Sequence, residues 1–209
     1  MTAPALGVEQ AVPPLAGFTV GVTAARRADE LGAMLERRGA CVLHGPAIRI
    51  VPLADDTRLR EATEGLVARP PDITVATTGI GFRGWVEAAD GWGVGEDLLK
   101  ALGHGRLIAR GPKARGAIRA SGLADEWSPP SESSAEVLDY LLDGGVDGLR
   151  IAVQLHGEPL PDVVEALRVA GAEVVEVPVY RWVPPADLAP MDRLTDAALS
   201  GGIDVLVFT

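Results

Sequence analysis

The sequence predicts an α/β protein whose parallel sheets are covered by helices on both faces. Short apolar runs typical of buried strands alternate almost throughout with segments whose apolar residues recur at helical spacing. Such alternation favours parallel strands joined by right-handed helical crossovers. A composition of 47% hydrophobic and 23% charged residues is that of a chain able to bury a core.

The expected strands are the apolar runs, such as FTVGVT near the start and DITVATT in the middle of the chain. Each is short and bounded by Gly, Pro, Asp or charged residues, as buried parallel strands usually are. In chain order, strands are expected over residues 18–23, 40–43, 72–78, 106–110, 149–155, 172–178 and 203–209.

The expected helices lie between these strands and show a spacing of three or four between apolar residues. In the first, Leu31, Met34 and Leu35 share one face and Gly39 ends the helix. Ser131, Ser133 and Ser134 precede a later helix as candidate N-caps. In chain order, helices are expected over residues 28–39, 57–68, 84–90, 95–103, 112–122, 133–145, 162–172 and 191–202.

Composition also excludes several classes of protein. An aromatic content of 4% and a net charge of -10 argue against a general nucleic-acid surface, which needs clustered cations and stacking side chains. The single cysteine, Cys41, cannot form an internal disulfide, which fits a reducing cytoplasm, and we expect it to be a small core residue. We identify neither a membrane-spanning run nor a signal peptide, and we expect residues 1–16 to form a flexible arm.

Part of the chain is repeated. GACVLHGPAIRIVP at residues 39–52 aligns without a gap to GAEVVEVPVYRWVP at residues 171–184, and Pro46 pairs with Pro178 in this register. We interpret this as an internal duplication. Equal copies would extend the chain to about residue 276, so roughly 65 residues are expected beyond Thr209, and a fused C-terminal domain is a further possibility.

Four segments in this order resemble the uroporphyrinogen-III synthase family: VTAARRADELGAMLERRGA, DITVATTGIG, ARGPKARGAI and GAEVVEVPVYRWVP. The resemblance implies two flavodoxin-like α/β lobes with parallel sheets, joined by a two-stranded linker. One lobe would be discontinuous and truncated, formed by residues 17–44 and 187–209. Residues 53–177 would form the inserted lobe, and residues 45–52 and 178–186 the two linkers.

The same resemblance implies an activity. Family members are cytoplasmic lyases of heme and tetrapyrrole biosynthesis that cyclise hydroxymethylbilane to uroporphyrinogen III with inversion of ring D. They use neither a metal nor an organic cofactor, so we expect none here. The linear tetrapyrrole would be the only partner of this segment, without membrane or nucleic acid. Such a reaction asks the protein to fold the substrate, hold its carboxylates and deliver a proton to a leaving hydroxyl.

Tyr180 matches the family tyrosine thought to assist departure of the hydroxyl, and it is the predicted catalytic residue; packing at a hinge is the alternative. Hydroxyl and amide donors that follow the expected strands are the predicted substrate contacts. Thr77 and Thr78 carry an equally weighted alternative, capping of the next helix. The predicted substrate-binding residues are Thr23, Arg26, Arg49, Thr77, Thr78, Gly79, Gly111, Pro112, Lys113 and Arg181.

Three turns depart from the family pattern, with Ala24, Ile80 and Ala114 where an arginine, the usual turn and a threonine are expected. These departures leave open a second class of function, a non-catalytic synthase-like sensor domain of a transcriptional regulator. GIGFRG at residues 79–84 also matches the dinucleotide fingerprint. That fingerprint expects a full helix and then a strand that ends in an acidic residue, whereas here the short GWVEAAD is followed by GWGVGEDLLKALG. His44, His104 and His156 lack metal-site spacing, and we expect solvated or capping roles for them.

Overall fold

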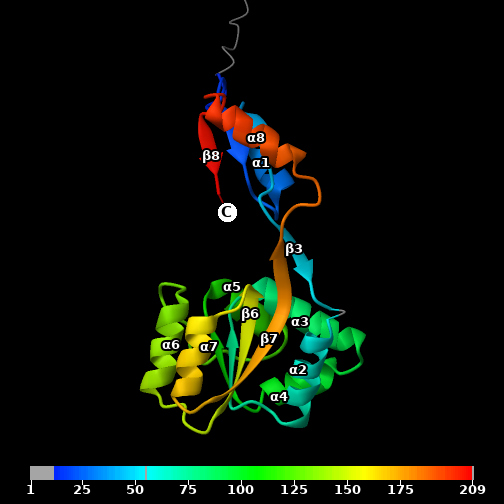
Figure 1. Ribbon diagram of the computed structural model, residues 1–209, viewed down its shortest axis with the longest axis vertical. Helices are drawn as coiled ribbons and strands as arrows, with labels where there is room; N and C mark the ends of the chain where they lie inside the picture. The colour runs from blue at the N-terminus through cyan, green and yellow to red at the C-terminus, as the bar shows by residue number, and fades with distance from the viewer. Residues whose placement is uncertain (1–11, 55, 209) are drawn as a thin grey trace, which may run out of the picture. The chain divides into compact units, whose positions relative to one another are not determined.

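The computed structural model describes residues 12–54 and 56–208, and it confirms the predicted α/β class. Its strands form two sheets, one of three and one of five strands. The chain divides into two compact units, which are described separately. The first unit contains the described residues up to Arg49 and those from Val183 onward, and the second unit contains Ile50–Trp182 (Figure 1).

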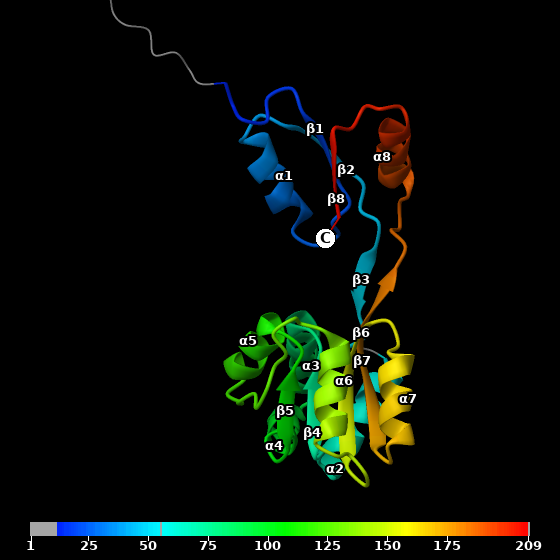
Figure 2. The same ribbon diagram turned by 90° about the vertical axis from the view of Figure 1, so that its left-hand side faces the viewer.

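The first unit is a three-stranded parallel sheet in the order β2-β1-β8. Helix α1 and helix α8 lie on opposite faces of this sheet (Figure 2). Gly21 and Gly45 leave room for the side chain of Leu194 from α8, which packs directly on the backbone. The bounds are β1 (Thr19–Val22), α1 (Ala28–Glu36), β2 (Cys41–His44), α8 (Ala189–Leu199) and β8 (Val205–Val207).

One expectation fails in this unit. Cys41 is exposed rather than part of the core, because alternate residues of a strand face opposite sides and the side chain of Cys41 points to solvent. The buried apolar residues of the unit come instead from β1 and the segments that flank the strands: Val20, Val22, Ala24 and Ala40.

The second unit contains a five-stranded sheet in the order β3-β7-β6-β4-β5. The pairs β4 with β5, β4 with β6 and β6 with β7 are parallel, as predicted. The strands are β3 (Arg49–Pro52), β4 (Ile73–Ala76), β5 (Arg106–Ala109), β6 (Arg150–Gly157) and β7 (Glu173–Val183).

Six helices cover both faces of this sheet. Helices α6 and α7 lie on one face, and α2, α3, α4 and α5 cover the other (Figures 1 and 2). Each face has its own core: Phe82 and Trp85 are fully buried on the four-helix side, and Leu167 is fully buried on the two-helix side. The helices are α2 (Thr57–Ala68), α3 (Gly79–Gly91), α4 (Gly95–Leu102), α5 (Pro112–Ala120), α6 (Ser134–Asp143) and α7 (Pro161–Val169).

Strand β3 lies in the segment predicted as the first linker, and two element boundaries differ from the sequence prediction by five residues. Helix α3 begins at Gly79 instead of residue 84, because Thr78 caps it and GIGFRG is already helical. Strand β7 does not end at residue 178 but continues to Val183, and its pairing with β6 extends to Arg181. Sheet hydrogen bonds, invisible in a local pattern, therefore hold the segment that we predicted as the second linker.

The predicted flexible arm over residues 1–16 falls largely outside the described residues, which begin at residue 12. Within the described part, Leu15 is held in place: its amide donates to the carbonyl of Arg38 at 2.8 Å, and its side chain packs on the core of the first unit. Among the helices of the described chain, we find none with the length and apolar character that crossing a membrane requires.

Candidate functional site

The carboxyl edge of the five-stranded sheet gathers most of the predicted site residues. The ends of parallel strands meet at one edge, and ligands of α/β proteins usually bind there. Thr77 and Thr78 follow β4, and Gly111 is the second residue after β5. The hydroxyl oxygens of Thr78 and Tyr180 lie 3.5 Å apart, although 102 positions separate these residues in the sequence.

Thr77 and Thr78 have different roles at this edge. Thr77 is buried, and its hydroxyl donates to the main-chain carbonyl of Gln154 at 2.9 Å, which ties β4 to β6. The hydroxyl of Thr78 accepts a hydrogen bond from the amide of Gly81 at 3.2 Å and so caps α3. Capping, the alternative that we weighed for this pair, is therefore correct for Thr78.

The turn after β5 places the amino terminus of α5 next to that of α3. Gly111 is the N-cap, Pro112 occupies the first turn, and no side chain caps the amides. Gly79 is required here, because a β-carbon at this position would collide with the main-chain carbonyl of Lys113. The Lys113 side chain itself is exposed. Two helix amino termini thus share one edge, where their partial positive charge favours an anion.

Ala114 stands in this turn where the family pattern has a threonine. Its side chain is only 1% exposed and packs in the core on the four-helix side of the sheet. The position therefore contributes a methyl group to the core, and the hydroxyl that the family pattern places there has no substitute at this residue.

Tyr180 and Arg181 point to opposite sides of β7. Tyr180 is 8% exposed, and its ring packs in the core on the four-helix side of the sheet. Arg181 is exposed, as expected for the next residue of a strand. The structure therefore brings the Tyr180 phenol to Thr78 and leaves Arg181 on the surface.

Gln154 is a site residue that our sequence prediction missed. It is fully buried on β6, and its amide nitrogen lies 3.2 Å from the Thr77 hydroxyl oxygen and 3.0 Å from that of Thr78. The signal was present in the sequence, because a glutamine inside the apolar strand LRIAVQL is unusual. A buried polar side chain generally needs hydrogen-bond partners, so a polar residue within an apolar strand indicates a polar cluster at that position.

Arg110, His156 and Trp182 form a second cluster at the same edge. The Arg110 guanidinium lies 3.5 Å from the imidazole Nε2 of His156, whose ring packs edge-on against the Trp182 indole with centroids 6.3 Å apart. Burial, together with the nearby Arg110 charge, lowers the pKa of His156 below its ordinary value, against the opposing effect of Glu158. The solvated or capping role expected for His156 is therefore wrong, because the ring is partly buried beside a cation.

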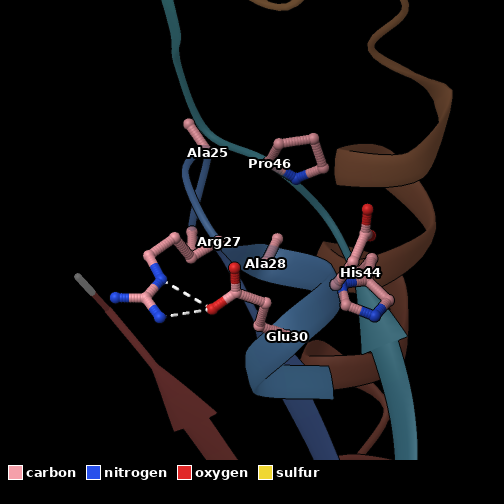
Figure 3. Close-up of a pocket in the computed structure, with 8 residues that line it drawn as sticks. Ala25, Arg27, Ala28, Glu30, His44 and Pro46 are labelled. Carbon is pink, nitrogen blue, oxygen red and sulfur yellow. Dashed lines mark hydrogen bonds and ion pairs between the residues drawn. The ribbon is translucent and has the colours of Figure 1, made fainter. Parts of the chain in front are cut away.

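A hollow in the first unit lies where β1 leads into α1 (Figure 3). It has a volume of about 370 Å³. Arg27 lies on its wall with its side chain ion-paired to Glu30, at 2.6 Å between nitrogen and oxygen. Asp29 also lines the hollow, so the acidic groups outnumber the one arginine. Its charge therefore does not favour a carboxylate ligand.

Three predicted site residues belong to the first unit, and none of them lines this hollow. The Thr23 hydroxyl donates to the main-chain carbonyl of Val207 at 3.0 Å and so ties β1 to β8. Arg26 is exposed in the loop before α1, where the hollow is lined by Arg27 instead. Arg49 begins β3 and is exposed.

The structure does not support the dinucleotide alternative. Gly79, Gly81 and Gly84 all lie inside α3 rather than in a turn before it. The space beside Gly81 is filled by the Gln154 amide, and the Lys113 carbonyl fills that beside Gly79, so a pyrophosphate has no room there. Within residues 12–54 and 56–208, no three His, Cys, Asp or Glu side chains gather as metal ligands would.

The profile of the family described as "Uroporphyrinogen-III synthase HemD" matches residues 29–209. The chain belongs to the uroporphyrinogen-III synthase family. The predicted resemblance is thus confirmed, and with it the assignment to a family of tetrapyrrole biosynthesis.

Solved structures of this family have a similar fold. A crystal structure of a mutant uroporphyrinogen III synthase from Thermus thermophilus is 29% identical, with a TM-score of 0.76 over 90% of this chain and 71% of that one. The wild-type enzyme from the same bacterium is 31% identical, with a TM-score of 0.67 over 90% of this chain and 70% of that one.

Two curated proteins are also similar in sequence to this chain. An uncharacterized protein of Bacillus subtilis (strain 168), YjjA, is 26% identical over 93% of this chain and 72% of its own length. A putative uroporphyrinogen-III synthase of Methanothermobacter thermautotrophicus is 27% identical over 47% of this chain and 39% of its own length.

Proposed function

We propose that the protein is a uroporphyrinogen-III synthase that cyclises hydroxymethylbilane and that Tyr180 is its general acid. The observation that carries the proposal is the position of the Tyr180 phenol, beside the capping threonine of α3 and at the sheet edge where the α3 and α5 amino termini meet. Membership of the family supplies the substrate class.

In the proposed reaction, the C–O bond of the terminal hydroxymethyl group breaks as Tyr180 donates its proton to the departing oxygen. Water leaves, and the resulting azafulvene is attacked by the substituted carbon of ring D. In the spiro intermediate the bond from this carbon to the methylene bridge of ring C breaks, and the bridge bonds instead to the unsubstituted α-carbon of ring D, which closes the macrocycle. That α-carbon then loses its proton, which restores the phenol, so the net reaction releases one water. A phenol suits this step because it donates without carrying a permanent charge.

The proposed function also requires that a protein of net charge -10 bind a substrate with many carboxylates. At the carboxyl edge of the second unit, the uncapped first turn of α5 offers main-chain amides, and Lys113 extends from the same turn. Arg110 adds a cation whose one hydrogen bond among the described side chains is the long contact to His156. Local donors of this kind can bind carboxylates whatever the overall charge, because screening limits the reach of distant charges.

The direct test is incubation of the protein with freshly generated hydroxymethylbilane, followed by separation of the product isomers. The expected product is the type III isomer, at a rate proportional to protein concentration. The type I isomer forms without an enzyme. If it were the only product at every protein concentration, the protein would not be a synthase.

Tyr180→Phe tests the role of the phenol. The substitution keeps the buried ring but removes the proton donor, so we expect type III formation to slow by about 100-fold or more. Tyr140→Phe is the matched control, because Tyr140 is the other of the two tyrosines and its hydroxyl bonds to Glu126, away from this edge. Equal rates for Tyr180→Phe and the unsubstituted protein would remove Tyr180 from the mechanism.

The buried methyl of Ala114 favours a second candidate, a synthase-like domain that binds a tetrapyrrole without converting it. A domain that lacks a hydroxyl of the family pattern can retain ground-state binding and lose contacts that form only in the transition state. The isomer assay separates the two candidates. Saturable binding of hydroxymethylbilane with no type III product supports the sensor, and catalytic turnover excludes it.

A further inference from the structure

Four hydrogen bonds made by Thr77 and Thr78 fix the direction of the hydrogen bond between Thr78 and Tyr180. Thr77 has one hydroxyl proton, and it is committed to the main-chain carbonyl of Gln154, which can only accept. The Thr77 oxygen must therefore accept from the Gln154 side chain, 3.2 Å away. This requirement assigns the amide NH₂ of Gln154 to the threonine side, because the amide oxygen has no proton to give.

The second proton of that NH₂ group points to the Thr78 oxygen at 3.0 Å. Thr78 also accepts from the main-chain amide of Gly81 at 3.2 Å. A hydroxyl oxygen has two lone pairs, and both are now occupied. The hydroxyl of Thr78 must therefore act as a donor, and the described side chain in its reach is the Tyr180 phenol, at 3.5 Å.

We propose that Gln154 is a positioning residue which, through Thr78, makes Tyr180 accept from the protein and leaves the phenol proton free for the substrate. The inference rests on the proposed function of Tyr180. It explains why the strand holds a fully buried glutamine, a position that a methionine would fill without a hydrogen-bonding group. Burying this glutamine is unfavourable in one respect, because its amide oxygen is buried and has no hydrogen-bond partner among the described residues.

Gly81 supports the same role from the opposite side of the amide. A β-carbon at residue 81 would collide with the Gln154 amide nitrogen and lie 2.8 Å from the Thr78 hydroxyl oxygen. The helix therefore has a glycine where the amide must enter. Three glycines occur in the first six residues of α3, and the Gln154 side chain accounts for this one.

The kinetic test uses Gln154→Met, which keeps the volume and removes both donors. The Thr78 oxygen then has a free lone pair that competes with the substrate for the Tyr180 proton. We expect kcat to fall about 2- to 12-fold, the effect of one neutral hydrogen bond, with KM unchanged. Thr74→Val is the matched control, because the Thr74 hydroxyl on neighbouring β4 is buried without a partner among the described residues; it should change neither constant.

A double-mutant cycle separates positioning from mere support of the fold. In a Tyr180→Phe background no phenol proton remains to be directed, so Gln154→Met should cause no further loss of kcat. The proposal would be overturned if the double variant lost kcat by the product of the two single-variant factors. It would also be overturned if Gln154→Met alone had the kcat of the unsubstituted protein.

Gly81→Ala provides a second variant if Gln154→Met fails to fold. It displaces the amide without removing a polar group, and alanine favours a helix. We expect the same selective loss of kcat. Gly84→Ala is its matched control in the same helix, because no atom beyond its chain neighbours and the backbone of its own helix lies within 4 Å of the added carbon. Equal kcat values for the two alanine variants would contradict the inference.

A readout independent of turnover distinguishes failure of the inference from failure of the proposed function. Ultraviolet resonance Raman spectra of the Tyr140→Phe protein report on Tyr180 alone, and the tyrosine doublet indicates whether a phenol accepts or donates. We expect acceptor character that weakens in Gln154→Met. If this change occurs in a protein that makes no type III isomer, the function fails and the hydrogen-bond direction stands. An unchanged doublet overturns the direction itself.

Discussion

Single residues at the sheet edge gain their properties from neighbours distant in sequence. The Tyr180 phenol meets Thr78 from β4, and the His156 imidazole meets Arg110 from β5. In both pairs one partner follows the end of a strand and the other lies on a strand of the same sheet. The chemistry of each side chain is therefore set by the order of the strands rather than by its flanking sequence.

The pKa of His156 leads to a prediction about stability. Burial and Arg110 lower this pKa in the folded protein, whereas the unfolded chain titrates near the ordinary value of about 6.5. Below that pH the unfolded state binds the proton more readily, so the free energy of unfolding should fall as the pH drops from about 6.5 through the lower folded-state pKa. Urea unfolding between about pH 7 and 5 measures this slope.

His156→Gln should flatten that pH dependence, whereas His104→Gln, at an exposed position, should not. Glu126 does not contribute to this slope, because hydrogen bonding to Arg106 lowers its pKa and moves its contribution to more acid pH. If the free energy of unfolding depended equally on pH in the unsubstituted protein and in His156→Gln, folding would not lower the pKa of His156.

At the scale of elements, local capping and long-range packing fix the helices of the second unit in different ways. Helix α2 coincides with its predicted bounds, residues 57–68, and Asp56 caps it by accepting from the Arg58 amide at 2.8 Å. Ser133 caps α6 in the same manner, as predicted. The sequence prediction starts helix α3 at residue 84 instead of Gly79, because a glycine-rich segment is typical of a loop. The groups that fill the space beside these glycines are known only from the structure.

Asp56→Ala tests the contribution of a local cap. Removing the acceptor leaves an amide of the first turn of α2 without its cap, so the free energy of unfolding should fall by about 1 kcal/mol. Asp56→Asn keeps an acceptor oxygen and should retain most of the stability. Denaturant titration of the three proteins gives the comparison. Equal losses for alanine and asparagine would instead point to the charge of Asp56.

For the whole molecule, burial is divided between the two units. Two extensive clusters of buried apolar residues lie within the second unit, and the cluster of the first unit is built from four buried residues. These clusters share no residue. We therefore expect the units to open separately, with the higher protection from hydrogen exchange in the second.

Leu66→Ala tests this division. Leu66 is fully buried in the four-helix core of the second unit, so its truncation should destabilise that unit by about 2 to 5 kcal/mol. In hydrogen exchange followed by mass spectrometry, peptides that cover β4, β5 and β6 should exchange faster. Peptides from β1 and β2 should keep their rates. Uniform acceleration along the chain would mean that the protein opens as one cooperative unit.

The sequence by itself determined the α/β class, the order of the elements other than β3, and the family. It could do so because a buried parallel strand needs a continuous apolar run and a covering helix needs an apolar face, and both are local patterns. The segments that resemble the family, among them the turn at Gly111 and the motif at residues 171–184, are also local, and they occur in the family's order along the chain. Tyr180 could be proposed as a site residue from such a motif alone.

Only the tertiary structure decided how the site is connected. Strand β7 runs through the predicted linker because β6 pairs with it, and Arg26 is exposed while Arg27 lines the hollow. The Gln154 amide reaches Thr77 and Thr78 across 77 and 76 positions of sequence. The direction of each hydrogen bond depends on which neighbour has a proton left to give, and that becomes known only when the strands lie side by side.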